Sequence, residues 1–393
     1  MVARTIVRSM NVTERARRQR VRLSTVEALS ARRDEWNALV GRSHTQTVFQ
    51  TYEWHASWWK TLGSGRQPLV LLVEEGRELR GIAPLMWSER RLWGRQRKII
   101  EFIGAGSSDY CDFIVDRDHP EALPLLVQWL SEHAGEWDVL HLSDIPNTTP
   151  TLSLLPRLFC SYGYLTDVRK LYEAPTRLLG DPVADKQCVK KKSLRRHYNY
   201  FRRRGRLDVK HCRTEEEICQ YLDLFFQQHI ERRALTDVPS QFLNERQRAF
   251  YRTLVRELAP TGWLLFSVVL FNDIPLAFHF GFEFGDRLVW YKPTFNVRYA
   301  KHSPGEVLIK YLLEYAIERQ MAEFDFTIGE ESFKYRFANH VRYNYAIHVF
   351  GHRLLCWRHR LWMSTKARVK RFPRLARWGR RVIQHMRRFD GDD

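Results

Sequence analysis

The sequence predicts an α/β protein of two tandem domains, each a mixed, mostly antiparallel sheet flanked by helices. Three observations carry this prediction. The 393 residues exceed what a single hydrophobic core usually serves. The composition, with 44% hydrophobic and 13% aromatic residues, is typical of packed globular chains. The order helix, helix, hairpin, strand, helix, strand also occurs twice, once in residues 21–185 and once in residues 186–350.

The first half opens with two helical patterns and continues with strands. Apolar runs bounded by Gly, Asn and Asp predict the strands, and apolar residues at helical spacing predict the helices. Prolines and glycines in residues 147–185 predict a linker. The expected helices are 25–40, 49–59 and 120–133, and the expected strands are 68–74, 79–86, 98–103, 112–115 and 137–142.

The second half repeats this order. Asn272-Asp273 and Gly285-Asp286 provide the turn residues that join its strands. The expected helices are 214–233, 240–258 and 306–319, and the expected strands are 262–271, 274–284, 287–292 and 323–328.

Both ends of the chain are basic. Residues 1–20 are polar and predict a disordered tail. In the tail of residues 351–393, the stretch from Arg353 to Arg388 holds thirteen Lys or Arg and no acidic residue, within a net charge of +19. Apolar residues at helical spacing there predict amphipathic helices, divided at Pro373. Such helices fit either peripheral contact with an anionic membrane or packing against the body of the protein.

Several classes of protein are disfavoured. The longest apolar run, 263–271, is far shorter than the ~20 residues that span a bilayer. The N-terminus has no apolar signal segment, so we expect a cytoplasmic protein, with the basic tail able to reach the inner face of the membrane. The six cysteines form no CxxC pair and lack histidines at zinc-finger spacing, so neither disulfides nor a metal site is expected.

Ser303-Pro304-Gly305 marks a possible phosphate site at the start of the 306–319 helix. A helix N-terminus offers unpaired N–H groups and partial positive charge, and glycine lets a phosphate approach the backbone. The same tripeptide also begins ordinary helices. The residues expected to bind the cofactor are Arg298, Lys301, Ser303, Gly305 and Glu306.

The order of several motifs carries a family resemblance. The chain shows Asn272 to Ala277 (NDIPLA), Tyr299 to Leu308 (YAKHSPGEVL) and Asp325 to Lys334 (DFTIGEESFK). Its first half adds 49–59 (FQTYEWHASWW), 81–85 (GIAPL) and 109–113 (DYCDF). Over residues 25–350 the chain resembles the GNAT superfamily of acyltransferases, in its cellulose-biosynthesis-type and Fem-like branch.

This resemblance implies an enzyme that transfers an acyl group from acetyl-CoA or another acyl-CoA, without a metal. Two strands would splay apart to admit the pantetheine arm, and an amine or hydroxyl of an amino sugar, polysaccharide precursor or similar acceptor would approach from the other side. Two alternatives stay open. One is a Fem-type peptidyltransferase that uses aminoacyl-tRNA. The other is a non-catalytic, membrane-associated factor in exopolysaccharide production.

Four residues are candidates for catalysis, each with a structural alternative. His279 could accept a proton, or could be an ordinary strand histidine. Asp325 could hold the amine or orient a histidine, or form a structural hydrogen bond. Lys334 could neutralise an oxyanion or a phosphate, or be a surface lysine. Tyr291 could protonate the leaving thiolate, or be part of the core.

A basic helix is expected at residues 191–205. It could be a solvated face, or the wall of a groove for an anionic acceptor or a transfer RNA. Fem-type enzymes usually carry a coiled-coil insertion, and this sequence has no heptad run, which disfavours transfer RNA. The oligomeric state is left open.

Overall fold

A computed structural model describes residues 19–92 and 94–370, with side chains up to residue 361. The predicted disorder of residues 1–20 therefore lies outside the described residues, except that Gln19 and Arg20 begin a strand. The predicted break at Pro373 also lies outside them.

The strands are β1 (Gln19–Ser24), β2 (Gln67–Glu75), β3 (Glu78–Leu92), β4 (Arg95–Phe102), β5 (Ile114–Val115), β6 (Val139–Pro146), β7 (Leu165–Leu178), β8 (Leu207–Cys212), β9 (Leu264–Phe271), β10 (Ile274–Phe284), β11 (Arg287–Phe295), β12 (Glu323–Asp325) and β13 (His340–Phe350). The α-helices are α2 (Arg33–Arg42), α3 (Tyr52–Leu62), α4 (Ala122–Glu132), α5 (Thr151–Ser161), α6 (Pro182–Val189), α7 (Lys192–Arg202), α8 (Glu215–Ala234), α9 (Glu245–Leu258), α10 (Pro304–Glu318), α11 (Ser332–Phe337) and α12 (Arg353–Lys370). Short 3-10 turns lie at Glu27–Arg32, Val48–Gln50, Ala134–Glu136, Gln241–Leu243, Ala259–Thr261 and Val297–His302.

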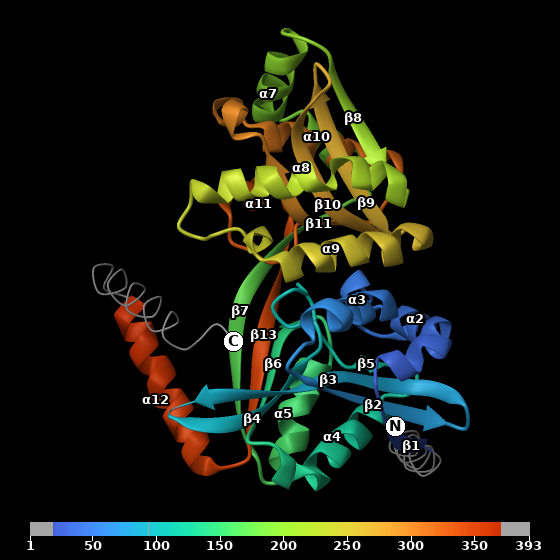
Figure 1. The fold of residues 1–393 in the computed structure, drawn as a ribbon, viewed down its shortest axis with the longest axis vertical. Coiled ribbons are helices and arrows are strands. Elements are labelled where there is room, and N and C mark those ends of the chain that lie inside the picture. The colour runs from blue at the N-terminus through green and yellow to red at the C-terminus, as the bar shows by residue number, and fades with distance from the viewer. Residues whose placement is uncertain (1–18, 93, 371–393) are drawn as a thin grey trace.

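One continuous sheet runs through the molecule in the order β1-β2-β3-β4-β6-β13-β7-β12-β11-β10-β9-β8, and β5 pairs with β3 (Figure 1). The last strand, β13, lies between β6 and β7, which both come from the first half. In turn β7 pairs with β12 of the second half. Strands from the two halves are therefore interleaved in the sheet. The long strands β7 and β13 run between the two halves of the molecule (Figure 1).

Each half contains the same unit. In the first half, β2, β3 and β4 form antiparallel pairs, and β4 then pairs in parallel with β6, which follows helix α4. In the second half, β9, β10 and β11 form antiparallel pairs, and β11 pairs in parallel with β12, which follows helix α10. The mixed, mostly antiparallel tandem architecture predicted from the sequence is confirmed.

An aromatic core joins the halves on one face of the sheet. The ring centroids of Trp54 in α3 and Phe250 in α9 lie 5.3 Å apart, and those of Phe49 and Phe282 lie 5.9 Å apart. Aromatic pairs at these distances add to the free energy gained by burying their area. On the opposite face, two separate cores lie under α4 and α5 in the first half and under α7 and α10 in the second.

The segment 147–185 is not the predicted linker, because it forms α5, β7 and α6. Three of its four prolines occupy positions that regular structure tolerates, and the fourth, Pro156, lies inside α5. Pro150 precedes the first residue of α5, and Pro182 is the first residue of α6. Pro175 lies inside β7, where its carbonyl accepts a 3.1 Å hydrogen bond from the amide of Phe326. The prediction was wrong because proline was taken as a sign of a linker.

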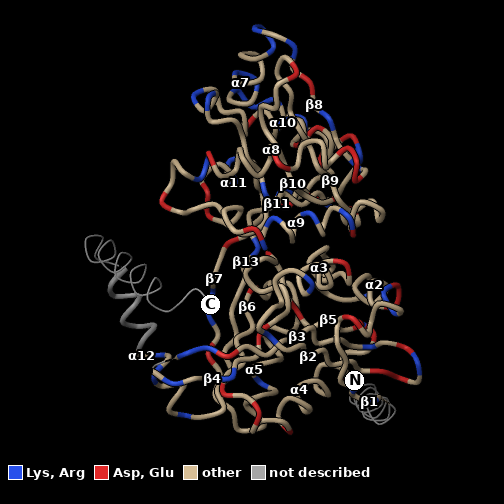
Figure 2. The backbone as a smooth tube through the Cα atoms, viewed as in Figure 1, with Lys and Arg blue, Asp and Glu red and all other residues tan. Residues whose placement is uncertain are grey.

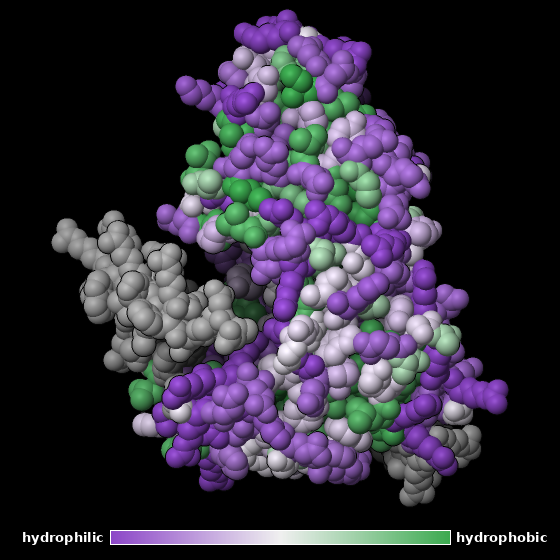
Figure 3. Space-filling view, in the orientation of Figure 1, coloured by the Kyte–Doolittle hydropathy of each residue, from purple (hydrophilic) through white to green (hydrophobic). Residues whose placement is uncertain are grey.

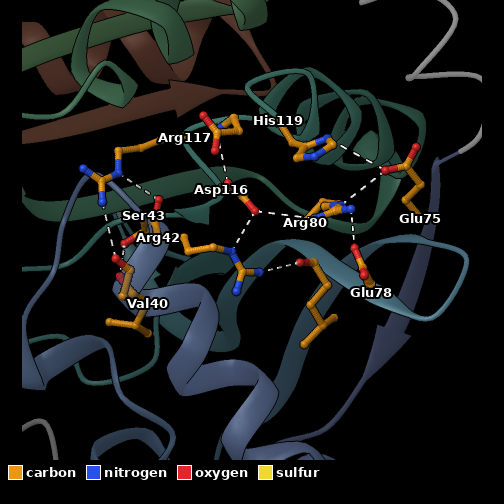
Figure 4. A network of polar contacts seen from close by, with 12 residues as sticks. Val40, Arg42, Ser43, Glu75, Glu78, Arg80, Asp116, Arg117 and His119 are labelled. Carbon is orange, nitrogen blue, oxygen red and sulfur yellow. Dashed lines mark hydrogen bonds and ion pairs between the residues drawn. The ribbon is translucent and has the colours of Figure 1, made fainter.

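A polar network holds α2 against the hairpin in the first half (Figure 4). At its centre, Asp116 accepts a 3.0 Å hydrogen bond from Arg42 and lies 3.7 Å from a guanidinium nitrogen of Arg80. Arg117 donates to the main-chain carbonyl of Arg42 at 3.0 Å. This network joins α2 to β3 and to the segment after β5.

In the described part of the chain, no helix combines the length and the apolar character needed to cross a bilayer.

Candidate functional site

Strands β11 and β12 part after a short parallel contact. They pair only from Arg287 with Glu323 to Val289 with Asp325, although β11 continues to Phe295. The chain turns away at Thr327, which has a φ of +56°, so β12 is shorter than the predicted 323–328. The hydroxyl of Thr327 then bridges to the carbonyl of Trp290 at 2.9 Å. The splayed strands predicted from the family resemblance are therefore present.

A cavity of about 310 Å³ lies at this opening. Its walls come from both halves of the chain. Strand β11 contributes Trp290, Tyr291 and Lys292, the end of α8 contributes Arg232 and Arg233, the segment after β12 contributes Thr327, Ile328 and Lys334, and the first half contributes Asp109 and Asp144.

The cavity holds buried ionisable groups of both signs. Asp109 is only 5% exposed, and burial raises its pKa against the opposing effect of Lys292. Burial also raises the pKa of Asp144 to about 6. Desolvation lowers the pKa of Lys292, whose ammonium lies 3.9 Å from the centroid of the Tyr291 ring. Groups shifted toward neutrality in this way are candidates for proton transfer.

Two of the predicted catalytic residues, Tyr291 and Lys334, line this cavity. The Tyr291 hydroxyl donates to the carbonyl of Ser107 at 2.6 Å, and burial raises its pKa well above the usual value. The Lys334 ammonium donates to the carbonyl of Ile328 at 2.7 Å and lies 3.1 Å from a carboxylate oxygen of Glu331. Gly329 makes room for it, because a Cβ at that position would lie 2.8 Å from Lys334 Nζ.

The other two catalytic candidates lie outside the cavity. Asp325 accepts hydrogen bonds from the Tyr110 hydroxyl at 2.9 Å and from the Thr327 amide at 2.8 Å, and burial raises its pKa to about 6. It lines a separate cavity of about 150 Å³. His279 is fully buried against Trp290, with ring centroids 4.9 Å apart, and desolvation lowers its pKa to about 3. These surroundings favour the structural alternative for His279.

The predicted phosphate turn lies at the far end of the same strand. Ser303 has a φ of +50°, and α10 begins at Pro304. A Cβ on Gly305 would meet Phe295, the last residue of β11, at 3.7 Å. Among the described residues, the Gly305 amide has no hydrogen-bond partner. The Glu306 amide, in contrast, donates to the Ser303 carbonyl at 3.0 Å, and its carboxylate accepts from Arg336 at 2.7 Å.

Positive charge surrounds this helix start. Arg298 and Lys301 are exposed beside it. Helix α7 packs nearby, with Tyr200 stacked on His302 at 3.6 Å between ring centroids. Figure 2 shows Lys and Arg gathered around α7, and Figure 3 shows a strongly hydrophilic surface at that end of the molecule. The exposed cations on α7 and directly beside its ends are Lys191, Lys192, Arg195, Arg196, Arg202, Arg203 and Arg204.

The sequence prediction missed Asp109, Asp144 and Lys292 as site residues. Asp109 is the first residue of the DYCDF motif, and Lys292 directly follows Tyr291, a predicted catalytic residue. Both could therefore have been found from their place beside these residues. The sequence around Asp144 contains no motif that indicates a functional site. It reaches the cavity through a backbone φ of +62° at the end of β6.

Comparison with known proteins agrees with this geometry. Residues 189–335 match the model of the acetyltransferase (GNAT) domain. No curated protein sequence matches the chain significantly.

Among solved structures, FemX is similar, with a TM-score of 0.56 and 12% identity over 83% of this chain and 96% of FemX. A conserved protein of unknown function from Bacteroides thetaiotaomicron VPI-5482 gives a TM-score of 0.55 and 14% identity over 84% of this chain and all of that one. L-PGS from Bacillus licheniformis gives 0.50 and 14% over 81% of this chain and 91% of that one. At such identities the likeness shows the fold alone. The part of the chain that contains the splayed strands, residues 189–335, thus carries an acyltransferase-like GNAT domain.

Proposed function

We propose that this protein is an acyl-CoA-dependent N-acyltransferase of the cellulose-biosynthesis-type branch, which acylates an amine held in the central cavity. The observation that carries the proposal is the opening between β11 and β12, which leads into a charged cavity, together with the end of β11 against the N-terminus of α10.

The donor would bind along β11. Its diphosphate would meet the free amide of Gly305 and the partial positive charge of the helix start, with Arg298 and Lys301 adding charge. The pantetheine arm would run along the edge of β11 that β12 leaves unpaired, and it would bring the thioester to the cavity. The basic helix α7 would attract the polyanionic donor from solution.

In the transfer step, the amine nitrogen attacks the thioester carbonyl. The new C–N bond forms, the C–S bond breaks, and the amine loses one proton while the thiolate of CoA gains one. We assign the amine's proton to Asp109, because its buried carboxyl has a raised pKa and faces the cavity. Lys334, which donates to the Ile328 carbonyl, would stabilise the developing oxyanion. Tyr291 is a poor donor to the thiolate because burial raises its pKa, so the thiolate would take its proton from water.

The acceptor follows from the polarity of the cavity. Arg232, Arg233 and Lys292 offer cationic contacts, while Asp144 and Glu331 offer anionic ones. Such walls suit a polar amine that also carries hydroxyl or anionic groups, as amino sugars and polysaccharide precursors do. Apolar amines would leave these charged groups of the cavity without partners.

A second candidate donor is an aminoacyl-tRNA, as in Fem-type peptidyltransferases. The observation that favours it is the row of exposed cations on α7, which could contact an RNA backbone.

Titration calorimetry of the full chain with CoA, acetyl-CoA and bulk transfer RNA separates the candidates. The proposal predicts saturable binding of CoA, and release of free CoA from acetyl-CoA when an amine acceptor is present. RNA binding with a steep salt dependence, together with no binding of CoA, would replace the proposal by the second candidate. Binding of CoA without turnover of any amine acceptor would support the non-catalytic alternative.

A further inference from the structure

A cluster of metal-ligating side chains lies away from the central cavity, where β7, β13 and α12 meet. Asp167 comes from β7, His348 from β13 and His359 from α12. One donor atom of each residue lies within 4.8 Å of the others. The three residues come from separate segments of the chain, so no ligand spacing in the sequence could reveal them.

One ring nitrogen of each histidine in this cluster lacks a hydrogen-bond partner. Among the described side chains, His348 Nδ1 and His359 Nε2 are buried atoms that neither donate nor accept a hydrogen bond. The whole His359 side chain is only 8% exposed. Its Nε2 lies 3.4 Å from a carboxylate oxygen of Asp167, which suits two ligands of one ion. Buried polar atoms are normally satisfied, so two such nitrogens in one cluster with a carboxylate indicate a missing partner.

The carboxylate of the cluster has charged neighbours of its own. Arg169 donates to the Asp167 carboxylate, and a guanidinium nitrogen of Arg360 lies 3.9 Å from its other oxygen. The hydrogen bond from Arg169 orients this carboxylate, as partners of a ligating carboxylate commonly do.

A cavity of about 390 Å³ borders the two histidines, and it could hold a water molecule beside the ion. Its lining includes His141, His348, His359, Arg90 and Arg91, but not Asp167. The ring of His141 stacks on His348 at 4.6 Å between centroids, and His141 Nδ1 lies 3.3 Å from Glu101. His348 is thereby held in one orientation.

We propose that Asp167, His348 and His359 bind a divalent transition-metal ion, with zinc as the best fit. Two imidazoles and one carboxylate form a common zinc ligand set, which water would complete to four. The ion would hold α12 against the sheet. Among the side chains of this helix that the structure describes, Leu355 and Cys356 belong to a small apolar cluster. The site is structural and independent of acyl transfer.

The test uses the full chain, freed of metal by a chelator and titrated with Zn²⁺ in a calorimeter. Wild type should bind one ion per chain at this site. His359→Gln and Asp167→Asn should each weaken binding at least tenfold. His352→Gln is the matched control, because His352 is exposed and directly precedes the same helix. Its affinity should equal that of wild type.

Two further readouts keep the result interpretable. Co²⁺ bound to wild type and to His352→Gln should give visible absorption bands that His359→Gln lacks, with circular dichroism as the check on folding. Should the variants fail to fold, Zn²⁺ must still protect His348 and His359 of wild type from diethyl pyrocarbonate, as read by peptide mass spectrometry. No saturable zinc binding by wild type, or unprotected histidines in the presence of zinc, overturns the proposal.

Discussion

The hydroxyl of Tyr291 donates a 2.6 Å hydrogen bond to the main-chain carbonyl of Ser107. This contact joins strand β11 of the second half to the loop that follows β4 in the first. The same loop carries Asp109 into the cavity that Tyr291 lines. The site is therefore completed only when the two halves pack together, although residues 189–335 alone match the acetyltransferase domain.

Replacing Tyr291 by Phe removes this hydrogen bond. We expect the free energy of unfolding to fall by about 1 kcal/mol, the usual net value of such a bond. Because the raised pKa of Tyr291 makes it a poor acid, kcat should fall less than about tenfold, below the usual contribution of a general acid. Chemical denaturation and CoA-release kinetics measure the two effects. A hundredfold loss of kcat with unchanged stability would instead make Tyr291 the acid.

Replacing Asp109 by Asn removes the proposed proton acceptor. We expect kcat to fall by about 10² to 10⁴, the range for a lost general base, while the Kd for CoA changes little. The control is Asp286→Asn in the exposed turn before β11, which should behave as wild type. Full activity in the Asp109 variant would remove this carboxylate from the mechanism.

The buried carboxyl of Asp144 should make stability depend on pH. Its pKa is about 6 in the folded chain and near 3.8 when unfolded. The native state is therefore favoured while the group is protonated, and this advantage is lost as pH rises through 6. Asp144→Asn stays neutral, so it should be more stable than wild type above pH 6, by at most about 3 kcal/mol, and equal below pH 4. Thermal melts at pH 4, 6 and 8 check this, with the exposed Asp237→Asn as control.

The first turns of α12 present an apolar face to solvent. Leu354 and Trp357 are 65% and 63% exposed and lie at helical spacing, between exposed arginines. From this face we propose peripheral binding to anionic membranes. Trp357→Ala and a chain ending at Gly351 should each reduce co-sedimentation with vesicles that contain phosphatidylglycerol. Neutral vesicles are the control. Equal sedimentation of all three proteins would contradict this role.

Much of the fold could be predicted from local patterns. The hairpins, the helix after Ser303 and the tandem order follow from periodicity and turn residues. Strand β13 was not predicted, because its place between β6 and β7 depends on partners that lie far away in the chain. The site was predicted only in part for the same reason. Tyr291 and Lys334 belong to a local motif, whereas Asp109 and Asp144 reach the cavity only through the packing of the first half.

The most direct test of the proposed donor site is a calorimetric titration of Gly305→Leu with CoA. A side chain at Gly305 meets only Phe295, at 3.7 Å, so the variant should fold, yet it would cover the amide meant for the diphosphate. Gly41→Leu, a helical glycine whose Cβ meets no neighbour, is the control. We predict that wild type and Gly41→Leu bind CoA alike and that Gly305→Leu binds at least tenfold more weakly. Equal binding by all three proteins would contradict a donor site at the start of α10.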